Sequence, residues 1–146
     1  MHPVNLAITS IGPNKHGSDG MIKAINEQPS YKTQFTNGKE VSFSDTTSDK
    51  GGGGVSFRPH ELLEAALANR MNISLRMFAE EHSIPLSSVS TTVTLDRSKP
   101  GEVCFEYAVS LPDDLSESDR QLLLDETRSC PVRQTLSKKL TFRMLP

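Results

Sequence analysis

The stretch PHELLEAALANRMNISLRMFA, residues 59–79, decides the fold because it carries the longest helical pattern in the chain. Pro59 suits the first turn of a helix, and the helix is expected to end before Pro85. A helix this apolar, in a chain of 146 residues, is expected to lie at the centre of the core. Its apolar residues recur at helical spacing, at Leu62, Leu63, Ala66, Leu67, Ile73, Met77 and Phe78.

Short segments with strand-like patterns precede this helix. Residues 31–36 and 41–44 flank Asn37-Gly38, a dipeptide that favours the tight turn of a β-hairpin. Residues 21–26 alternate between two faces, and residues 4–9 alternate weakly, so both are predicted to be strands. The first part of the chain is therefore expected to be β-structure.

A second β region follows the helix. Residues 89–95 and 103–110 alternate in hydrophobicity, and turn-forming residues at 97–101 separate them, which predicts an antiparallel hairpin. Next, Ser116 is followed three residues later by Asp119, a spacing that resembles a capping box. This spacing predicts the start of a second helix.

The second helix is expected to run to about Arg128 before Cys130-Pro131 breaks it. A short helical turn at 132–136 and a last strand at 140–144 are predicted after the break. Strands, a long helix, a hairpin, a helix and a strand, in that order, indicate an α+β fold rather than alternating βαβ units.

The composition is that of an ordinary globular chain, with 35% hydrophobic and 23% charged residues. The length favours one domain spanning residues 1–146. The net charge is -2 and the Lys and Arg residues are scattered, so no nucleic-acid surface is predicted. The apolar stretches are far shorter than the roughly 20 residues that cross a bilayer. We therefore expect neither nucleic acid nor a membrane as a partner.

Two cysteines, Cys104 and Cys130, are too few for a disulfide framework, and residues 1–10 lack the features of a secretory signal. We therefore expect a cytoplasmic protein with reduced thiols. The four histidines show no ligand spacing with each other or with the cysteines, so no metal site is predicted. No motif indicates a cofactor.

Two segments resemble the OsmC/Ohr family of thiol peroxidases. FRPHELLEAALANR, residues 57–70, is similar to the start of that family's central helix, where a proline, a glutamate, paired leucines and alanines precede a cysteine. RSCPVRQTL, residues 128–136, is similar to the second cysteine motif, Cys-Pro-Val followed by a short turn. SLRMFAE, residues 74–80, fits the broader OsmC-like branch. Together with the order of elements, the resemblance covers most of residues 20–146.

The resemblance implies antiparallel sheets packed around the long central helix, in an intertwined homodimer with an active site at the interface. It also implies a role in organic hydroperoxide resistance and the oxidative stress response. In active members, one cysteine attacks the hydroperoxide and the second resolves the sulfenic acid as a disulfide. A glutamate and an arginine hold the reactive thiolate.

This chain departs from that pattern at three of the four positions. Arg70 stands where the attacking cysteine is expected. His60 follows Pro59, where the peroxidase branches have the glutamate, and Glu61 comes one residue later. Residues 1–57 contain no arginine to activate a thiolate. Only Cys130 matches the family residue for residue.

Arg70 cannot act as the attacking group, because a guanidinium is permanently charged and not nucleophilic. It lies within the apolar stripe, where a buried arginine needs a partner. One interpretation is an ion pair with Glu61, with Glu64 or with an acid of the partner subunit, and helix geometry puts Glu61 nearly opposite Arg70. Another is a site that binds a carboxylate or an oxidised headgroup. A third is that the stripe is not fully buried there.

Cys130 has two interpretations. Its place before Pro131 suggests the N-cap of the following turn, which favours a thiolate, and Arg128 and Arg133 flank it. It would then be a reactive thiol, with His60 as a candidate base and Glu61 as a further candidate. Alternatively, it is a relic that packs as a small hydrophobe. For Cys104, mid-strand, structural packing is the default.

Three functional hypotheses follow. The first is an OsmC/Ohr-like stress-response scaffold that has lost the two-cysteine mechanism and binds a small ligand beside Arg70. The second is a thiol-dependent organic hydroperoxide reductase or redox sensor that uses Cys130. The third is a structural or partner-binding dimer. The sequence leaves open whether the protein is an enzyme.

Overall fold

The computed structural model describes residues 20–28 and 30–146, which fall into two units divided at residue 59. The predicted strand at 4–9 lies outside the described residues, as do His2 and His16. The expectation of one domain over residues 1–146 stays a prediction. Within the described part of the chain, no helix has the length and apolar character needed to cross a membrane.

The first unit holds a three-stranded antiparallel sheet in the order β1-β2-β3. Its strands are β1 (Lys23–Asn26), β2 (Thr33–Thr36) and β3 (Val41–Ser44). The predicted hairpin between β2 and β3 is confirmed, and the Asn37 side chain shapes its turn by accepting backbone hydrogen bonds from Lys39 and Glu40. A 3-10 turn, η1 (Ser48–Lys50), interrupts the loop that follows.

The long helix is confirmed as α1 (Pro59–Glu81). Its buried side chains are spaced four residues apart, so they form one row along the helix: Leu67, Met71, Leu75 and Ala79. The apolar stripe is wider than this row: Leu63, Ile73 and Met77 are 45%, 49% and 49% exposed, which agrees with the third interpretation, in which the stripe is not fully buried around Arg70. That side of α1 is half-exposed in the described part of the chain.

The C-terminal end of α1 is closed by a Schellman motif. Ser83 has a φ of 52°, in the left-handed region, and its N–H bonds the carbonyl of Glu80. The N–H of Ile84 bonds the carbonyl of Ala79 at 2.8 Å, and Ile84 is buried beside Ala79 in the core. This turn ends the helix ahead of Pro85, as the sequence indicated.

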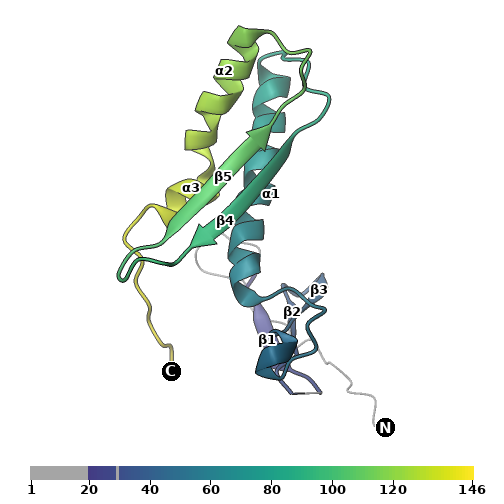
Figure 1. Cartoon of the computed structure of the whole chain (residues 1–146), viewed down its shortest axis with the longest axis vertical. Coiled ribbons are helices and arrows are strands. Elements are labelled where there is room, and N and C mark those ends of the chain that lie inside the picture. The colour runs from purple at the N-terminus through teal and green to yellow at the C-terminus, as the bar shows by residue number, and fades with distance from the viewer. Residues whose placement is uncertain (1–19, 29) are drawn as a thin grey trace. The chain divides into compact units, whose positions relative to one another are not determined.

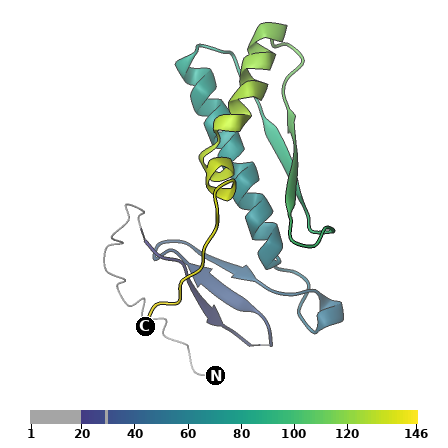
Figure 2. The same cartoon turned by 90° about the vertical axis from the view of Figure 1, so that its left-hand side faces the viewer.

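The rest of the second unit consists of a hairpin and a helical segment. The hairpin pairs β4 (Ser90–Asp96) with β5 (Cys104–Ser110), antiparallel. Then come α2 (Glu117–Glu126), η2 (Thr127–Ser129) and α3 (Pro131–Leu136). The predicted cap is confirmed, since the Ser116 hydroxyl accepts the N–H of Asp119. The hairpin and the α2–α3 segment both lie along α1 (Figures 1 and 2).

Two apolar clusters hold these elements against α1. One contains Leu75, Ala79, Ile84, Leu115 and Leu123. The other contains Leu67, Met71 and Cys130, with Val93, Phe105, Tyr107 and Val132 packed against it. The second cluster joins α1, the inner face of the hairpin and the start of α3, so it fixes the position of Cys130.

The predicted last strand at 140–144 is not formed. Beyond the turn at Ser137 the chain has no regular structure, and Phe142 is 95% exposed. The apolar alternation of this segment resembles that of a strand, but a strand also needs a neighbouring edge for its hydrogen bonds. Among the described residues, none pairs with it.

Replacing Ser83 by glycine is expected to stabilise the protein by about 0.5–1 kcal/mol, because glycine occupies the left-handed region without steric cost. Urea unfolding of Ser83→Gly measures this change. Ser88→Gly is the matched control: Ser88 lies five residues away outside the left-handed region, so glycine there is expected to lower stability. Equal effects of the two substitutions would contradict the strain assigned to Ser83.

Candidate functional site

Arg70 and Ser74 lie one turn apart on the same face of α1. The Nε of Arg70 and the Oγ of Ser74 are both buried, and neither has a hydrogen-bond partner among the described residues. Glu64 is already used elsewhere, since its carboxylate accepts the N–H of Leu95 at 3.0 Å. In the part of the chain that the structure describes, no carboxylate forms an ion pair with Arg70.

An unpaired buried donor is unfavourable, by about 1–3 kcal/mol for a neutral group and more for a charged one. Proteins therefore leave few such atoms, and two neighbouring ones on a single helix face call for a physical reason. The Arg70 Nε–H and the Ser74 hydroxyl are both hydrogen-bond donor groups. An oxygen atom of a bound anion would accept from both.

Arg70 and Ser74 both line a cavity of about 180 Å³. One wall comes from α1 and the other from the end of α2 and the turn around Cys130. The lining residues are Arg70, Ser74, Met77, Phe78, Glu81, Glu126, Ser129 and Pro131. Position 70, where the resemblance places the attacking cysteine, thus lies in the same cavity as both neighbours of Cys130. The central-helix segment and the Cys-Pro-Val segment, which the sequence analysis singled out, thus both contribute residues to this cavity.

Cys130 itself is not open to this cavity. It is the N-cap of α3, as its place before Pro131 suggested, but its side chain makes no capping hydrogen bond. Its exposed fraction is 0%, and it packs against Leu67 and Met71. A thiol must contact a hydroperoxide to attack it, so this packing favours the interpretation of Cys130 as a small hydrophobe.

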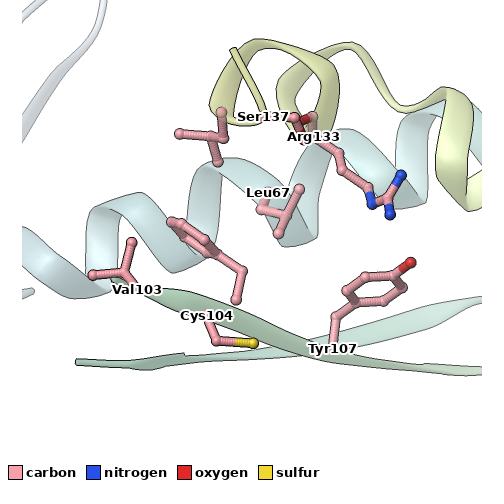
Figure 3. Close-up of a pocket in the computed structure, with 8 residues that line it drawn as sticks. Leu67, Val103, Cys104, Tyr107, Arg133 and Ser137 are labelled. Carbon is pink, nitrogen blue, oxygen red and sulfur yellow. The ribbon is translucent and has the colours of Figure 1, made fainter. Parts of the chain in front are cut away.

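Cys104 is exposed, and both cysteines are free thiols. Its neighbours Phe105 and Tyr107 pack against the cluster that contains Cys130. Side chains alternate between the two faces of a strand, so Cys104 points to the opposite face from Tyr107 (Figure 3). The sheet therefore separates the two sulfur atoms, and a Cys104–Cys130 disulfide does not fit this fold.

Cys104 shares its face with Asp96, its direct partner across the hairpin. The Ser98 hydroxyl and the Ser98 backbone N–H donate hydrogen bonds to Asp96, and they lower the pKa of its carboxyl below the ordinary value. Asp96 is thus ionised at neutral pH at the end of β4, and it does not line the Arg70 cavity. It takes no part in the candidate site.

His60 and Glu61 are not brought to the cavity. His60 is exposed at the second position of α1, and ten residues separate it from Arg70, about 15 Å along the helix axis. Glu61 has an interaction of its own. Neither residue lines the cavity, so their candidate catalytic roles gain no support from the geometry.

A second cavity, of about 300 Å³, lies between α3 and the hairpin (Figure 3). Arg133 and Tyr107 both point into it. Their polar groups have partners, however: Arg133 donates to the carbonyl of Arg128 at 3.3 Å, and the Tyr107 hydroxyl bonds that of Thr127 at 3.2 Å. It is lined by Leu67, Val103, Cys104, Phe105, Tyr107, Arg133, Leu136 and Ser137. The Arg70 cavity is the better candidate site because its donors lack partners.

No metal centre accompanies either cavity in the described ranges, where no group of three or more His, Cys, Asp or Glu residues is placed to hold an ion. Sequence reasoning found Arg70 and Cys130 but missed Ser74, Glu81 and Glu126. The i, i+4 spacing of Ser74 from Arg70 is a signal that was available. Nothing in the sequence indicates that Glu126, on another helix, meets the same cavity.

Comparisons with known proteins agree with the fold. The model of a family described as OsmC-like protein matches residues 51–144. A protein from Psychrobacter arcticus, described as an osmotic stress induced and detoxification response protein, is similar with a TM-score of 0.66 and 22% identity, over 82% of this chain and 90% of that one. At this identity the similarity shows the fold alone.

Two further solved structures are similar at the same level. An OsmC-like protein from Mycoplasma pneumoniae has a TM-score of 0.64 and 19% identity, over 82% of this chain and 88% of that one. An organic hydroperoxide resistance protein OsmC from Legionella pneumophila has a TM-score of 0.60 and 21% identity, over 84% and 92%. No curated protein matches the sequence.

The burial of the two thiols predicts their reactivity. Under native conditions, iodoacetamide is expected to alkylate Cys104 at least tenfold faster than Cys130, because only Cys104 is exposed. Mass spectrometry of timed samples measures both rates, and denaturation in urea should make them similar. Native alkylation of Cys130 at the rate of Cys104 would show that the Leu67–Met71 packing opens readily.

Proposed function

Because the chain belongs to the OsmC-like protein family, we propose that it is a stress-response protein that binds a small organic anion and does not reduce hydroperoxides by the two-cysteine mechanism. The observation that carries the proposal is the pair of buried, unpartnered donors at Arg70 and Ser74. Both residues line a cavity, and family resemblance puts the attacking thiol at position 70.

The chemistry of the side chains supports a loss of the two-cysteine mechanism. That mechanism forms a sulfenic acid on one thiol and then a disulfide with a second. A guanidinium at position 70 cannot form a sulfenic acid, and Cys130 is sealed in the core. Cys104, the other thiol, lies on the far face of the hairpin. No pair of described thiols is placed to complete the cycle.

The same side chains suit an organic acid. Arg70 supplies a permanent positive charge, and its Nε–H with the Ser74 hydroxyl supplies two donors for one carboxylate. Met77 and Phe78 continue the lining with apolar surface. The ligand class that fits this set is a small acid with an apolar portion next to its carboxylate.

We also propose that the protein is a cytoplasmic homodimer. Leu63, Ile73 and Met77 leave one side of α1 half-exposed and apolar, which is typical of a surface that another chain covers. A second copy on this side would lie beside Arg70, so the cavity would border the interface. Both cysteines are free thiols, as expected of a protein in a reducing compartment.

The alternative function is a thiol-dependent hydroperoxide reductase or redox sensor that uses Cys130. Its position as the N-cap of α3 favours this alternative, since the start of a helix stabilises a thiolate. It requires the cluster of Leu67 and Met71 to open before the sulfur can react. It also requires a reductant to return the oxidised sulfur to the thiol.

Binding of sodium hexanoate, a carboxylate with an apolar tail, tests the anion site. Arg70→Ala is expected to weaken binding about 10- to 100-fold, because it removes a charge-assisted hydrogen bond. Ser74→Ala should weaken it less, and Arg70→Lys should fall between, since lysine keeps the charge without the Nε–H. Titrations followed by NMR shifts measure each Kd.

The control for that titration is Arg76→Ala, which removes an exposed arginine of the same helix that does not line the cavity. It is expected to leave the Kd for hexanoate unchanged. Equal affinities of wild type and Arg70→Ala, with both proteins folded by circular dichroism, would contradict the proposed anion site.

Consumption of cumene hydroperoxide with dithiothreitol separates the two functions. We expect no turnover above the rate without protein, because Cys130 is buried and position 70 carries no thiol. Turnover that is lost in Cys130→Ser and kept in Cys104→Ser would instead establish the alternative. The Cys104→Ser variant is the control for reaction at an exposed thiol.

A further inference from the structure

The Arg70 cavity carries charges of both signs. Glu81 and Glu126 line it together with Arg70 and Ser74. Among the residues that the structure describes, neither carboxylate forms an ion pair. A cavity that only bound an anion would gain nothing from two carboxylates, since like charges repel. Glu81 is exposed and Glu126 is half-buried, so water reaches both carboxylates. Two carboxylates in a cavity that also holds Arg70 and Ser74 suit a ligand that carries a cation as well.

The positions of the two glutamates strengthen this point. Glu81 is the last residue of α1 and Glu126 is the last residue of α2, and neither helix has a basic residue in its last turn. The C-terminal end of a helix carries partial negative charge, so it favours cations and disfavours carboxylates. Both helix ends contribute a glutamate to the same cavity. The part of the cavity next to these glutamates therefore suits a positively charged group.

The unlike charges are separated along α1. Ser74 and Glu81 are seven residues apart, which is about 10 Å along a helix. Met77 and Phe78 lie between them on the same cavity wall. The Phe78 ring is held by stacking on His82, with 3.9 Å between ring centroids. The wall thus runs from donors, through an apolar stretch, to carboxylates.

We propose, on the basis of the anion site inferred above, that the ligand is a zwitterion with an apolar spacer. Its carboxylate accepts hydrogen bonds from Arg70 and Ser74. Its protonated amine lies by Glu81 and Glu126. Its methylene groups cross Met77 and Phe78. This chemistry is that of an ω-amino acid, in which carboxylate and ammonium stand at opposite ends of an alkyl chain.

Three probes of matched length test the inference on the full chain: 6-aminohexanoate, hexanoate and hexylamine. NMR titration at neutral pH gives a Kd for each. We expect 6-aminohexanoate to bind roughly 3- to 10-fold more tightly than hexanoate, because its ammonium adds a partly exposed ion pair. Hexylamine, which lacks the carboxylate, should bind more weakly than 6-aminohexanoate by a larger factor.

The carboxylates are tested by Glu126→Gln and Glu81→Gln, which keep the shape of each side chain and remove its charge. Both variants are expected to reduce the preference for 6-aminohexanoate over hexanoate towards unity. Glu80→Gln is the matched control, since it makes the same change next to Glu81 at a residue that does not line the cavity. It should leave the preference intact.

Separate results would overturn the two proposals. Equal affinity for hexanoate and 6-aminohexanoate, or an unchanged preference in both Glu81→Gln and Glu126→Gln, would overturn the zwitterion and leave the anion site standing. If these variants changed in oligomeric mass but kept the preference for 6-aminohexanoate, the carboxylates would belong to a contact between chains. That result would also overturn the zwitterion proposal. Failure of all three probes, or an unchanged hexanoate Kd in Arg70→Ala, would overturn the anion site itself.

Discussion

The row of side chains that α1 buries is the constraint on which the other features depend. Leu67, Met71, Leu75 and Ala79 fix which side of the helix faces the core. Successive residues turn by about 100° around the axis, so Arg70 and Ser74 must lie on the side next to Met71 and Leu75. That side meets the turn after α2, where a helix end leaves room for a cavity. The cavity is thus a consequence of which row is buried.

The same row decides what becomes of Cys130. The thiol fills the space between Leu67, Met71 and the hairpin, and a sulfur atom packs well among apolar side chains. An attacking thiol at position 70 would give Cys130 a resolving role. With arginine at position 70, the role that remains for Cys130 is packing. The closed cluster around Cys130 stabilises α3 against α1.

The sequence predicted the elements that local patterns determine. It predicted less about features that depend on contacts between residues far apart in the chain. The bounds of α1, the Asn37-Gly38 turn and the Ser116 cap rest on spacing within a few residues, and all are confirmed. Apolar periodicity cannot tell how wide a buried stripe is, so the sequence left open whether the stripe around Arg70, which includes Leu63 and Ile73, is buried. The prediction of a strand at 140–144 was wrong for a similar reason. Whether a segment pairs with a neighbouring strand does not depend on its own residues alone. Ser74, Glu81 and Glu126 look like ordinary solvated helix residues until the tertiary structure brings them to one cavity.

Unpaired polar atoms also determine how selective the cavity is. A site that leaves donors buried without partners penalises every ligand that cannot pair with them, and this penalty discriminates more strongly than a missing methylene group does. At Arg70 and Ser74 the penalty falls on ligands without an anion. At Glu81, which is exposed, and at Glu126, which is half-buried, it is smaller, because these carboxylates keep contact with water. For the ligand proposed above, the anionic end is therefore the stringent requirement, and the cationic end adds a smaller preference.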